Sequence, residues 1–364
     1  MAKIAIDARE LRTSSGRYVE RLLKYLQTLE SNHQYIVLLK PQDMDGWDPV
    51  SPNFTKVSCD HKEFTFDEQM GFREQLDRLQ ADLVHFTFPQ QPILYRGKTV
   101  TTVHDLTTLR FHNPDKKRTS FVIKQKIYAQ VIKRAARKST AVITPSGFVK
   151  DDLAAFSHVD PDKITITHEA ADRITDNPTP YPDLQNTQFI MYVGRPTPHK
   201  NLERLIEAYA LLRGQHPNLK LVLVGKKDAN YQRIAADVAA KDIPGVVFTD
   251  FASEGQLRWL YEHCAAYVFP SLSEGFGLPA LEAMVHGAPV VSSNATCLPE
   301  IYGDAAHYFN PLSVEEMTDA INEVLTDKNL RAELIKRGGH QASQYSWQRL
   351  AEQTLAVYNR ALND

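Results

Sequence analysis

Two carboxylates and two glycines lie close together in the segment Glu274-Gly275-Phe276-Gly277-Leu278-Pro279-Ala280-Leu281-Glu282. An apolar run typical of a strand precedes the segment, and Pro279 is compatible with the first turn of a following helix. Glycines let the backbone approach a ligand closely, and a helix N-terminus offers amides and a positive dipole end to an anion. Carboxylates repel phosphate, so we expect Glu274 and Glu282 to accept hydrogen bonds from hydroxyl groups beside it. The segment therefore predicts a site for a nucleotide sugar.

The same glycines match the dinucleotide fingerprint G-x-G-x-x-A, so a dehydrogenase has to be considered. Against it, the motif follows the fourth expected strand of its half of the chain, and the next strand ends at Ser292-Ser293-Asn294 without an acid for a ribose hydroxyl. Paired carboxylates also suggest a glycoside hydrolase, but that chemistry needs an acid pair away from a phosphate site. A binding protein without catalytic activity stays open, because the same groups would bind without turnover.

Two expected strand ends in the first half of the chain carry polar residues. The loop around Gly16 opens the first helix, and its amides and hydroxyls could meet a phosphate or could form an ordinary capped turn. His104 lies just past the β-branched run at 99–103, where it is either a ligand contact or a structural histidine. Its place at the end of a strand favours the ligand contact, because ligands bind at the carboxyl ends of parallel strands.

A third strand end, after the run at 189–193, carries two cations. Arg195 and Lys200 flank the proline-rich turn Pro196-Thr197-Pro198, and a helix capped near Asn201 is expected to follow. Two cations on a rigid loop, facing a glycine-rich helix start, would clamp a diphosphate. The alternative is that both are solvated surface charges.

The composition is that of a soluble globular protein, with 43% hydrophobic and 24% charged residues and a net charge of −2. Nothing in this balance attracts nucleic acid. We expect no signal peptide, because the chain enters a strand directly, and no apolar run approaches the length of a membrane span. Cys59, Cys264 and Cys297 are odd in number and unpatterned. We therefore expect a cytoplasmic protein with reduced thiols and no metal site.

The elements that position these groups alternate short apolar runs with longer amphipathic stretches. Strands are expected at 3–7, 34–40, 54–59, 82–86, 99–104, 140–144, 163–167, 189–193, 219–224, 246–249, 266–269, 289–292 and 306–309. Helices are expected at 17–30, 67–79, 119–138, 147–156, 201–213, 230–240, 254–264, 279–286, 315–325 and 345–362. This alternation predicts an α/β protein with parallel sheets that are covered on both faces.

A length of 364 residues favours two domains over one core. We expect an N-terminal Rossmann-like domain at 1–172, a proline-containing linker at 173–187, and a second Rossmann-like domain at 188–344. A last helix is expected at 345–364. Two doubly wound domains would face each other across a deep cleft that is formed by the carboxyl ends of their strands.

The spacing of Glu274 and Glu282 matches the E-x7-E motif, and the chain resembles the retaining glycosyltransferases of family 4, which have the GT-B fold. The resemblance includes Gly194-Arg195, Lys200-Asn201-Leu202 and Gly16-Arg17-Tyr18, so it covers nearly the whole chain. It implies that the final helix, from Ser346-Trp347, crosses back to the N-terminal, acceptor-binding domain.

Two details of the resemblance concern the donor. The segments 104–106 and 109–111, His-Asp-Leu and Leu-Arg-Phe, are most similar to the branch that uses GDP-mannose, and a UDP-sugar donor is the nearest alternative. Ser14 departs from the pattern, because relatives often have a second glycine there. The departure puts close approach of a diphosphate to that loop in doubt.

The resemblance implies roles for particular residues. Arg195 and Lys200 would hold the diphosphate, Glu274 would bind the hydroxyls of the donor sugar, and His104 would contact that sugar from the opposite domain. The implied donor-binding residues are Gly16, Asp250, Phe251, Gly275, Phe276, Gly277, Leu278 and Glu282, with Glu282 on the ribose and Asp250-Phe251 near the base. The family's retaining chemistry uses the leaving phosphate oxygen as the base and no catalytic metal or cofactor.

The acceptor, a glycan or a lipid-linked oligosaccharide, has one indirect signal. The segment 115–138 has nine Lys and Arg residues, one acid and interspersed apolar residues. A basic amphipathic helix of this kind can lie on an anionic membrane surface, which would place the protein at the inner face of the membrane. The alternative is an ordinary domain helix whose apolar stripe faces the sheet.

Overall fold

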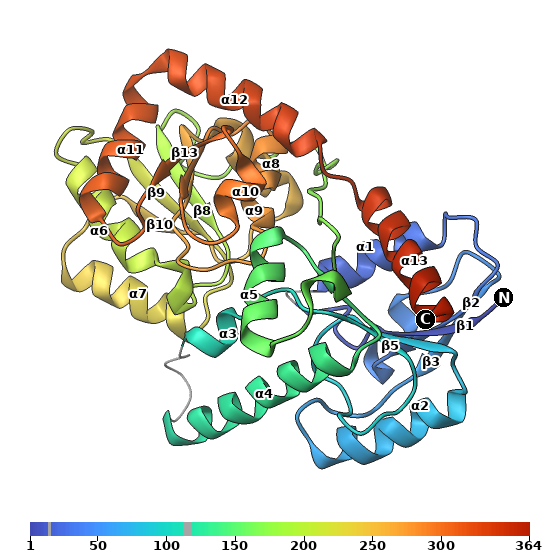
Figure 1. Ribbon diagram of the computed structural model, residues 1–364. Coiled ribbons are helices and arrows are strands. Elements are labelled where there is room, and N and C mark those ends of the chain that lie inside the picture. The colour runs from blue at the N-terminus through green and yellow to red at the C-terminus, as the bar shows by residue number, and fades with distance from the viewer. Residues whose placement is uncertain (14–15, 112–117) are drawn as a thin grey trace. The chain divides into compact units, whose positions relative to one another are not determined.

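The computed structural model describes residues 1–13, 16–111 and 118–364, with the backbone alone for 118–123. Ser14 therefore lies outside the described residues. The chain forms two compact units, of which the first contains 1–110, 118–169 and 346–364 (Figure 1). The second contains Phe111 and 170–345. Each unit is built on a parallel β-sheet covered by helices, which confirms the predicted α/β class.

The described strands of the first unit form a sheet in the order β3-β2-β1-β4-β5-β6-β7, and all neighbours are parallel. The strands are β1 (Lys3–Asp7), β2 (Gln34–Leu39), β3 (Phe54–Ser58), β4 (Leu83–Phe86), β5 (Thr99–Thr102), β6 (Ala141–Thr144) and β7 (Ile164–Ile166). The helices are α1 (Gly16–Leu26), α2 (Arg73–Leu79), α3 (Thr107–Arg110), α4 (Arg118–Lys138), α5 (Gly147–Ser157) and α13 (Trp347–Asn363). The expected helix at 67–79 begins as a π-helical turn, Glu68–Phe72, before α2.

The second unit has the strand order β10-β9-β8-β11-β12-β13, again with parallel neighbours. The strands are β8 (Phe189–Val193), β9 (Lys220–Val224), β10 (Val246–Phe248), β11 (Ala266–Phe269), β12 (Val290–Ser293) and β13 (Ala306–Phe309). The helices are α6 (Leu202–Leu212), α7 (Ala229–Ala240), α8 (Glu254–His263), α9 (Leu278–Val285), α10 (Leu298–Tyr302), α11 (Val314–Thr326) and α12 (Lys328–Ser343). The segment 173–187 contains no helix or strand and packs on this unit, where the Thr179 amide donates to the Gly255 carbonyl at 3.0 Å.

Helix α12 was not expected from the sequence. Its exposed, polar surface and the pair Gly338-Gly339 weaken the helical signal. The structure explains one glycine, because a β-carbon at Gly338 would lie 3.0 Å from the Met284 Cγ on α9. Helix α12 therefore needs a small residue where it packs closely against α9.

The C-terminal helix α13 lies beside α1 and contacts the sheet of the first unit (Figure 1). A buried chain of hydrogen bonds ties it there. The Tyr358 hydroxyl lies 2.6 Å from the His85 Nδ1, the His85 Nε2 lies 2.9 Å from the Thr102 Oγ1, and the Tyr18 hydroxyl lies 2.9 Å from the same oxygen. Burial, helped by the charge of His104, lowers the pKa of His85 to about 3. The imidazole is therefore neutral, and its partners are hydroxyls that can donate or accept.

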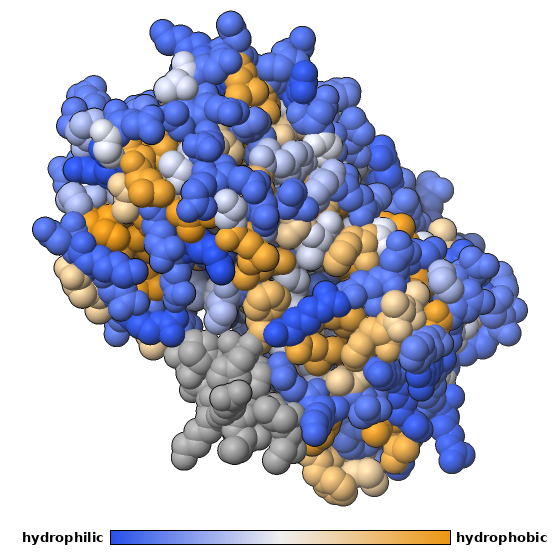
Figure 2. All heavy atoms as spheres, turned by 60° about the vertical axis from the view of Figure 1, so that its left-hand side comes forward, coloured by the Kyte–Doolittle hydropathy of each residue, from blue (hydrophilic) through white to orange (hydrophobic). Residues whose placement is uncertain are grey.

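The face seen in Figure 2 is mostly hydrophilic, with smaller groups of apolar residues between the polar ones. None of the helices in the described residues combines the length and apolar character that crossing a bilayer requires.

Candidate active site

The glycine segment enters α9 with a geometry that requires glycine. Gly277 immediately precedes the helix with a φ of +92°, and a β-carbon there would lie 2.1 Å from the Tyr302 hydroxyl oxygen. That hydroxyl donates to the Gly277 carbonyl at 2.6 Å. Leu278 and Pro279 form the start of the helix, and Gly275 and Phe276 are buried in the turn before it. The helix N-terminus is thus held by the backbone torsion and by a neighbouring side chain.

Lys200 and Glu274, both predicted site residues, are in direct contact. The Lys200 Nζ lies 2.5 Å from the Glu274 Oε1, and the two side chains are only 17% and 13% exposed. They come from different loops, after β8 and after β11, which meet because β8 and β11 are neighbours in the sheet. The Lys200 ammonium also lies 5.5 Å from the centre of the Phe269 ring. A cation and a carboxylate therefore share one partly shielded position near the start of α9.

Asn201 joins the two loops, and it lies at the N-cap position of α6, as expected. Its side chain makes no capping hydrogen bond to α6. The Asn201 Nδ2 instead donates to the carbonyls of Pro270 and Pro311, at 3.1 and 2.7 Å. The Leu272 amide adds a hydrogen bond of 2.7 Å to the His199 carbonyl. The Asn201 side chain therefore holds the loops together, because its amide group reaches two backbone carbonyls.

Two residues that hydrogen-bond to the backbone of Glu274 were not predicted from the sequence. The Glu274 amide donates to the Thr296 Oγ1 at 3.1 Å, and the Cys297 thiol donates to the Glu274 carbonyl at 3.3 Å. Burial and the nearby carboxylates of Glu274 and Glu300 raise the pKa of Cys297, so the thiol keeps its proton. No motif indicated these contacts, because Thr296 and Cys297 lie more than 20 residues further along the chain.

The other predicted cation and carboxylate, Arg195 and Glu282, lie in different surroundings. Arg195 is exposed, and within the described residues its guanidinium has no hydrogen bond or ion pair. Glu282 lies on α9, where it accepts a hydrogen bond of 3.4 Å from the Tyr261 hydroxyl.

Asp250 and Phe251 follow β10. Asp250 has a φ of +60°, and its Oδ1 accepts from the Lys227 amide at 2.9 Å. The carboxylate therefore supports the neighbouring loop after β9. Phe251 presents an exposed ring, a surface on which a planar base can stack.

In the first unit, both ring nitrogens of His104 face oxygen atoms. The Nε2 lies 3.0 Å from the Thr87 carbonyl and the Nδ1 lies 3.3 Å from the Glu169 Oε1. The rings of Tyr18 and Phe88 each lie 4.7 Å from the imidazole. Glu169 was missed in the sequence, although its place shortly after β7 is a strand-end position of the kind that drew attention to His104.

Gly16, a predicted donor-binding residue, has a structural reason to be glycine. It opens α1, and a β-carbon there would lie 2.0 Å from the Leu11 carbonyl oxygen. The Gly16 amide donates to the Thr13 carbonyl at 3.0 Å. Glycine is therefore required here by close contact with the protein's own backbone.

Two family models match consecutive segments of the chain. The model described as Glycosyltransferase Family 4 matches residues 15–173, and the model described as Glycosyl transferases group 1 matches residues 176–341. The boundary between them falls next to the start of the second unit.

Several curated proteins are similar in sequence. An O-antigen chain mannosyltransferase B from Escherichia coli is 31% identical over 72% of this chain and 70% of its own length. The O-antigen chain mannosyltransferase RfbU from Salmonella typhimurium is 30% identical over 66% of this chain and 63% of its own length. The serotype-specific mannosyltransferase WbdA from Escherichia coli is 32% identical over 66% of this chain, but this chain spans only 29% of WbdA.

Solved structures have the same fold at lower sequence identity. A sucrose-phosphate synthase from Thermosynechococcus elongatus is similar with a TM-score of 0.79 and 19% identity, over 99% of both chains. The HepE protein of Anabaena, solved in complex with UDP and glucose, is similar with a TM-score of 0.72 and 17% identity, over 99% of this chain and 100% of that one.

Proposed function

This chain belongs to glycosyltransferase family 4 and is a glycosyltransferase, and we propose that it transfers a mannosyl unit from GDP-mannose to a glycan or lipid-linked oligosaccharide. The names of the mannosyltransferase relatives support the choice of sugar. The observation that carries the site assignment is the contact between Lys200 and Glu274 near the start of α9. A cation beside a helix N-terminus favours the diphosphate of a nucleotide sugar, and the carboxylate favours its hydroxyls.

We assign the reaction steps to these residues as follows. Lys200 and Arg195 stabilise the negative charge that grows on the leaving nucleotide diphosphate. The bond between the anomeric carbon and the phosphate oxygen breaks while the acceptor oxygen attacks from the same face. The departing phosphate oxygen takes the proton of the acceptor hydroxyl, so the configuration is retained without a covalent enzyme intermediate. Glu274 holds hydroxyls of the donor sugar, and Glu282 holds those of the ribose.

We propose that His104 contacts the donor sugar. Both of its ring nitrogens already face oxygen atoms, so a hydroxyl has to replace one of them. The distance of 3.3 Å to Glu169 is the longer one, and this contact is the one that should open. Glu169 would then accept a hydrogen bond from the same hydroxyl.

The donor is tested by incubating the purified protein with GDP-mannose, UDP-glucose, UDP-N-acetylglucosamine and a dTDP-sugar, and by measuring nucleotide release. We expect release from GDP-mannose above that from all others. Release from a UDP-sugar would favour the alternative to which HepE points, because that neighbour was solved with UDP. Binding of a nucleotide sugar without release from any donor would favour a silent binding protein.

We propose that no metal takes part, as the family resemblance implies. The reaction rate should then be unchanged by EDTA and by added Mg²⁺ or Mn²⁺. A rate that falls with EDTA and recovers with one of these cations would contradict the proposal.

We also propose peripheral contact with an anionic membrane through α4. Side chains of the segment are described from Lys124 onwards, and Ile132 and Ala136 pack into the core of the first unit. Ile132 and Ala136 therefore face the core, as the apolar residues of an ordinary domain helix do. Ile127 differs, because its side chain is 57% exposed.

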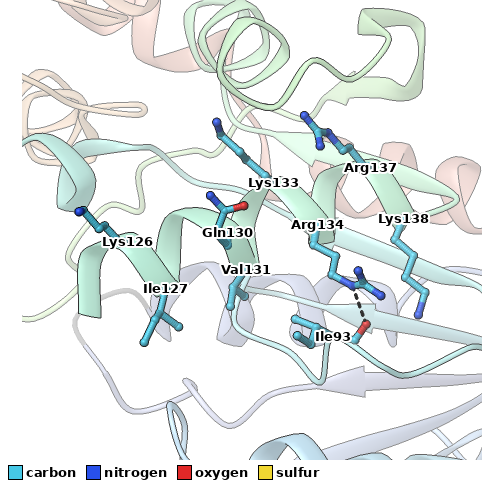
Figure 3. A pocket seen from close by; sticks show the side chains of 9 residues that line it. All are labelled: Ile93, Lys126, Ile127, Gln130, Val131, Lys133, Arg134, Arg137 and Lys138. Carbon is cyan, nitrogen blue, oxygen red and sulfur yellow. Dashed lines mark hydrogen bonds between the residues drawn. The ribbon is translucent and has the colours of Figure 1, made fainter. Parts of the chain in front are cut away.

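A shallow groove beside Ile127 supports the contact. Ile127, Val131, Arg134 and Lys138 lie on the side of α4 that faces the loop of Ile93, and the Arg134 Nε donates to the Ile93 carbonyl at 3.1 Å (Figure 3). Within the described residues, no carboxylate forms an ion pair with the cations that line this groove. Burial and the charges of Arg134 and Arg96 lower the pKa of Lys138. Such uncompensated cations favour an anionic partner.

The membrane proposal predicts flotation with vesicles of phosphatidylcholine and phosphatidylglycerol at low salt and release at high salt. The double substitution Lys126→Gln and Lys138→Gln should reduce flotation severalfold. The matched control, Lys24→Gln with Arg78→Gln, removes two exposed cations from other helices of the first unit and should not. Equal flotation of both variants would contradict the proposal.

A further inference from the structure

A loop of the first unit presents two phenylalanine rings to solvent. In residues 60–67, named here the Phe64 loop, Phe64 is 65% exposed and Phe66 is 80% exposed. The Phe64 ring touches the Tyr128 ring on α4, with ring centres 5.5 Å apart. One edge of Phe64 is therefore supported while much of the ring stays accessible.

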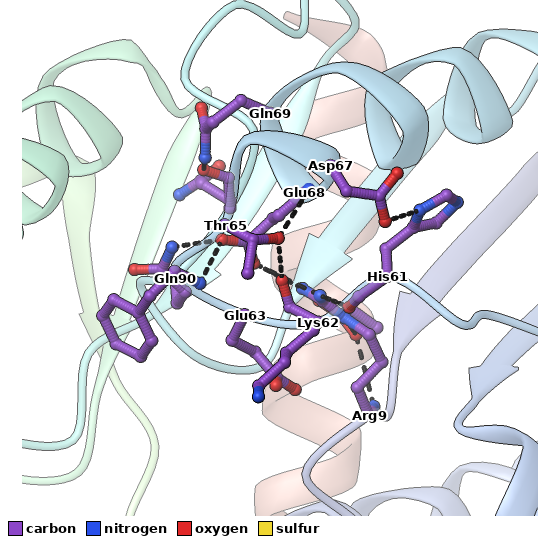
Figure 4. A network of polar contacts seen from close by, with 12 residues as sticks. Arg9, His61, Lys62, Glu63, Thr65, Asp67, Glu68, Gln69 and Gln90 are labelled. Carbon is purple, nitrogen blue, oxygen red and sulfur yellow. Dashed lines mark hydrogen bonds and ion pairs between the residues drawn. The ribbon is translucent and has the colours of Figure 1, made fainter.

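The backbone of the Phe64 loop is held by the buried carboxylate of Glu68. The Glu68 Oε2 accepts from the Phe64 amide at 2.9 Å, and the Glu68 Oε1 accepts from the Arg9 Nη1 at 3.2 Å (Figure 4). The Arg9 Nη1 also donates to the His61 carbonyl at 2.9 Å. Phe64 has a φ of +64°, which a residue with a β-carbon adopts rarely and keeps only where its surroundings hold it. Residues held in this way gather at ligand sites.

The loop lies at the carboxyl end of the parallel sheet, where ligands of such sheets bind. Arg9 follows β1 and Gln90 follows β4, and both side chains hydrogen-bond to Glu68. Gln90 is only 8% exposed, and its Oε1 has no hydrogen-bond partner among the described residues. Figure 4 shows this oxygen on the side of the amide that faces away from Glu68. A buried acceptor without a partner favours a ligand that donates hydrogen bonds.

Two exposed aromatic rings, and an unpartnered acceptor on a side chain that is bonded to the same Glu68 carboxylate as the loop, fit the chemistry of a saccharide. A pyranose ring has an apolar face of C–H groups that stacks on an aromatic ring, and its hydroxyls donate hydrogen bonds. We infer that the Phe64 loop is a saccharide-binding site, and that it holds part of the acceptor glycan. The second clause rests on the proposed function.

Saturation-transfer NMR with α-linked mannobiose and mannotriose tests the site on the full chain without a donor. Magnetisation transfer from the protein to the saccharides should fall about 3- to 10-fold in Phe64→Ala and in Phe66→Ala. It should be largely restored in Phe64→Tyr and Phe66→Tyr. The matched control, Val50→Ala, removes an exposed apolar side chain from another loop of the first unit and should leave transfer unchanged. Because both phenylalanines are exposed, the variants should fold, and their circular dichroism spectra verify this.

Equal transfer in the wild type and both alanine variants overturns the site, and so does absence of transfer to the wild type. Loss of vesicle flotation in Phe64→Ala, with saccharide transfer unchanged, overturns it in favour of a lipid contact. The donor assay is separate. Magnetisation transfer to the saccharides that depends on the Phe64 and Phe66 rings supports the site. If no sugar donor releases its nucleotide in the same preparation, the proposed enzymatic function is contradicted while the site stands.

Discussion

Lys200 and Glu274 neutralise each other in the structure, and a bound diphosphate would have to compete with Glu274 for the lysine ammonium. Both side chains are largely buried, so each needs a new partner when the ion pair opens. A diphosphate offers Lys200 more negative charge than Glu274 does, and sugar hydroxyls offer Glu274 new hydrogen bonds. Donor binding would therefore exchange one set of satisfied partners for another.

Lys200→Ala should lower kcat with the proposed donor by roughly 10²–10³, because a preorganised charge at the leaving group is lost. The unpaired Glu274 should also destabilise the second unit. Steady-state kinetics of nucleotide release measure the first effect, and Lys336→Ala, which removes an exposed lysine from α12, is the matched control. A kcat for Lys200→Ala within threefold of wild type would contradict the assignment.

Gly277 and Gly287 provide a direct test of the turn before α9. Both have positive φ, at +92° and +79°, but a β-carbon at Gly287 would meet nothing within 4 Å. Gly287→Ala should cost about 1 kcal/mol of unfolding free energy through backbone strain alone. Gly277→Ala should cost about 2 kcal/mol more, because the Tyr302 hydroxyl must move. Urea unfolding of both variants measures the difference, and equal costs would show that Tyr302 does not restrict this position.

At the scale of elements, α13 depends on a histidine that must stay neutral. Tyr358 on α13 contacts the His85 Nδ1, and burial lowers the pKa of His85 from 6.5 to about 3. Below pH 6.5 the unfolded chain binds a proton that the folded chain does not. The stabilisation by neutral His85 is therefore complete above pH 6.5 and is lost as the pH falls toward 3.

This linkage should lower the unfolding free energy by about 2 kcal/mol between pH 7 and pH 5, because each unit of pH in that range below 6.5 is worth about 1.4 kcal/mol. Urea unfolding followed by tryptophan fluorescence measures it, since Trp347 begins α13. His85→Gln should be less stable at pH 7 but should have a shallower pH dependence. His33→Gln, which changes a histidine outside this chain of hydrogen bonds, should keep the wild-type slope.

The elements themselves were largely predictable. Most expected strands and helices agree with the structure to within two residues, because strand and helix signals come from local apolar spacing. Helix α12 was missed because its polar surface and two glycines resemble a loop, and the need for Gly338 arises only from packing on Met284. Helix α10, Leu298–Tyr302, was too short to leave a periodic signal.

At the scale of the whole molecule, the first unit is closed by a segment from the far end of the chain. Residues 346–364 belong to the first unit although 170–345 form the second. Leu350, Ala351, Val357 and Tyr358 on α13 are buried. The stability of the first unit therefore depends on a helix that follows the whole second unit in the sequence.

Removing residues 346–364 should consequently loosen the first unit and spare the second. Hydrogen exchange measured by mass spectrometry should show faster exchange in α1 and in β4–β6, which α13 contacts, and unchanged exchange in β8 and β11. Removing only Asn363 and Asp364, which are poorly buried, is the control and should change neither unit. Unchanged protection of α1 after the larger deletion would contradict this view of α13.

The sequence alone determined the α/β class, the two sheets and the family, because strand and helix periods, turn glycines and the E-x7-E spacing are short-range properties. Only the tertiary structure decided which side chains meet. Lys200 reaches Glu274, Asn201 holds Pro270 and Pro311, and His85 contacts Tyr358 from 273 residues away. Such partners depend on strand order and helix packing, so the spacing of residues along the chain contains no trace of them.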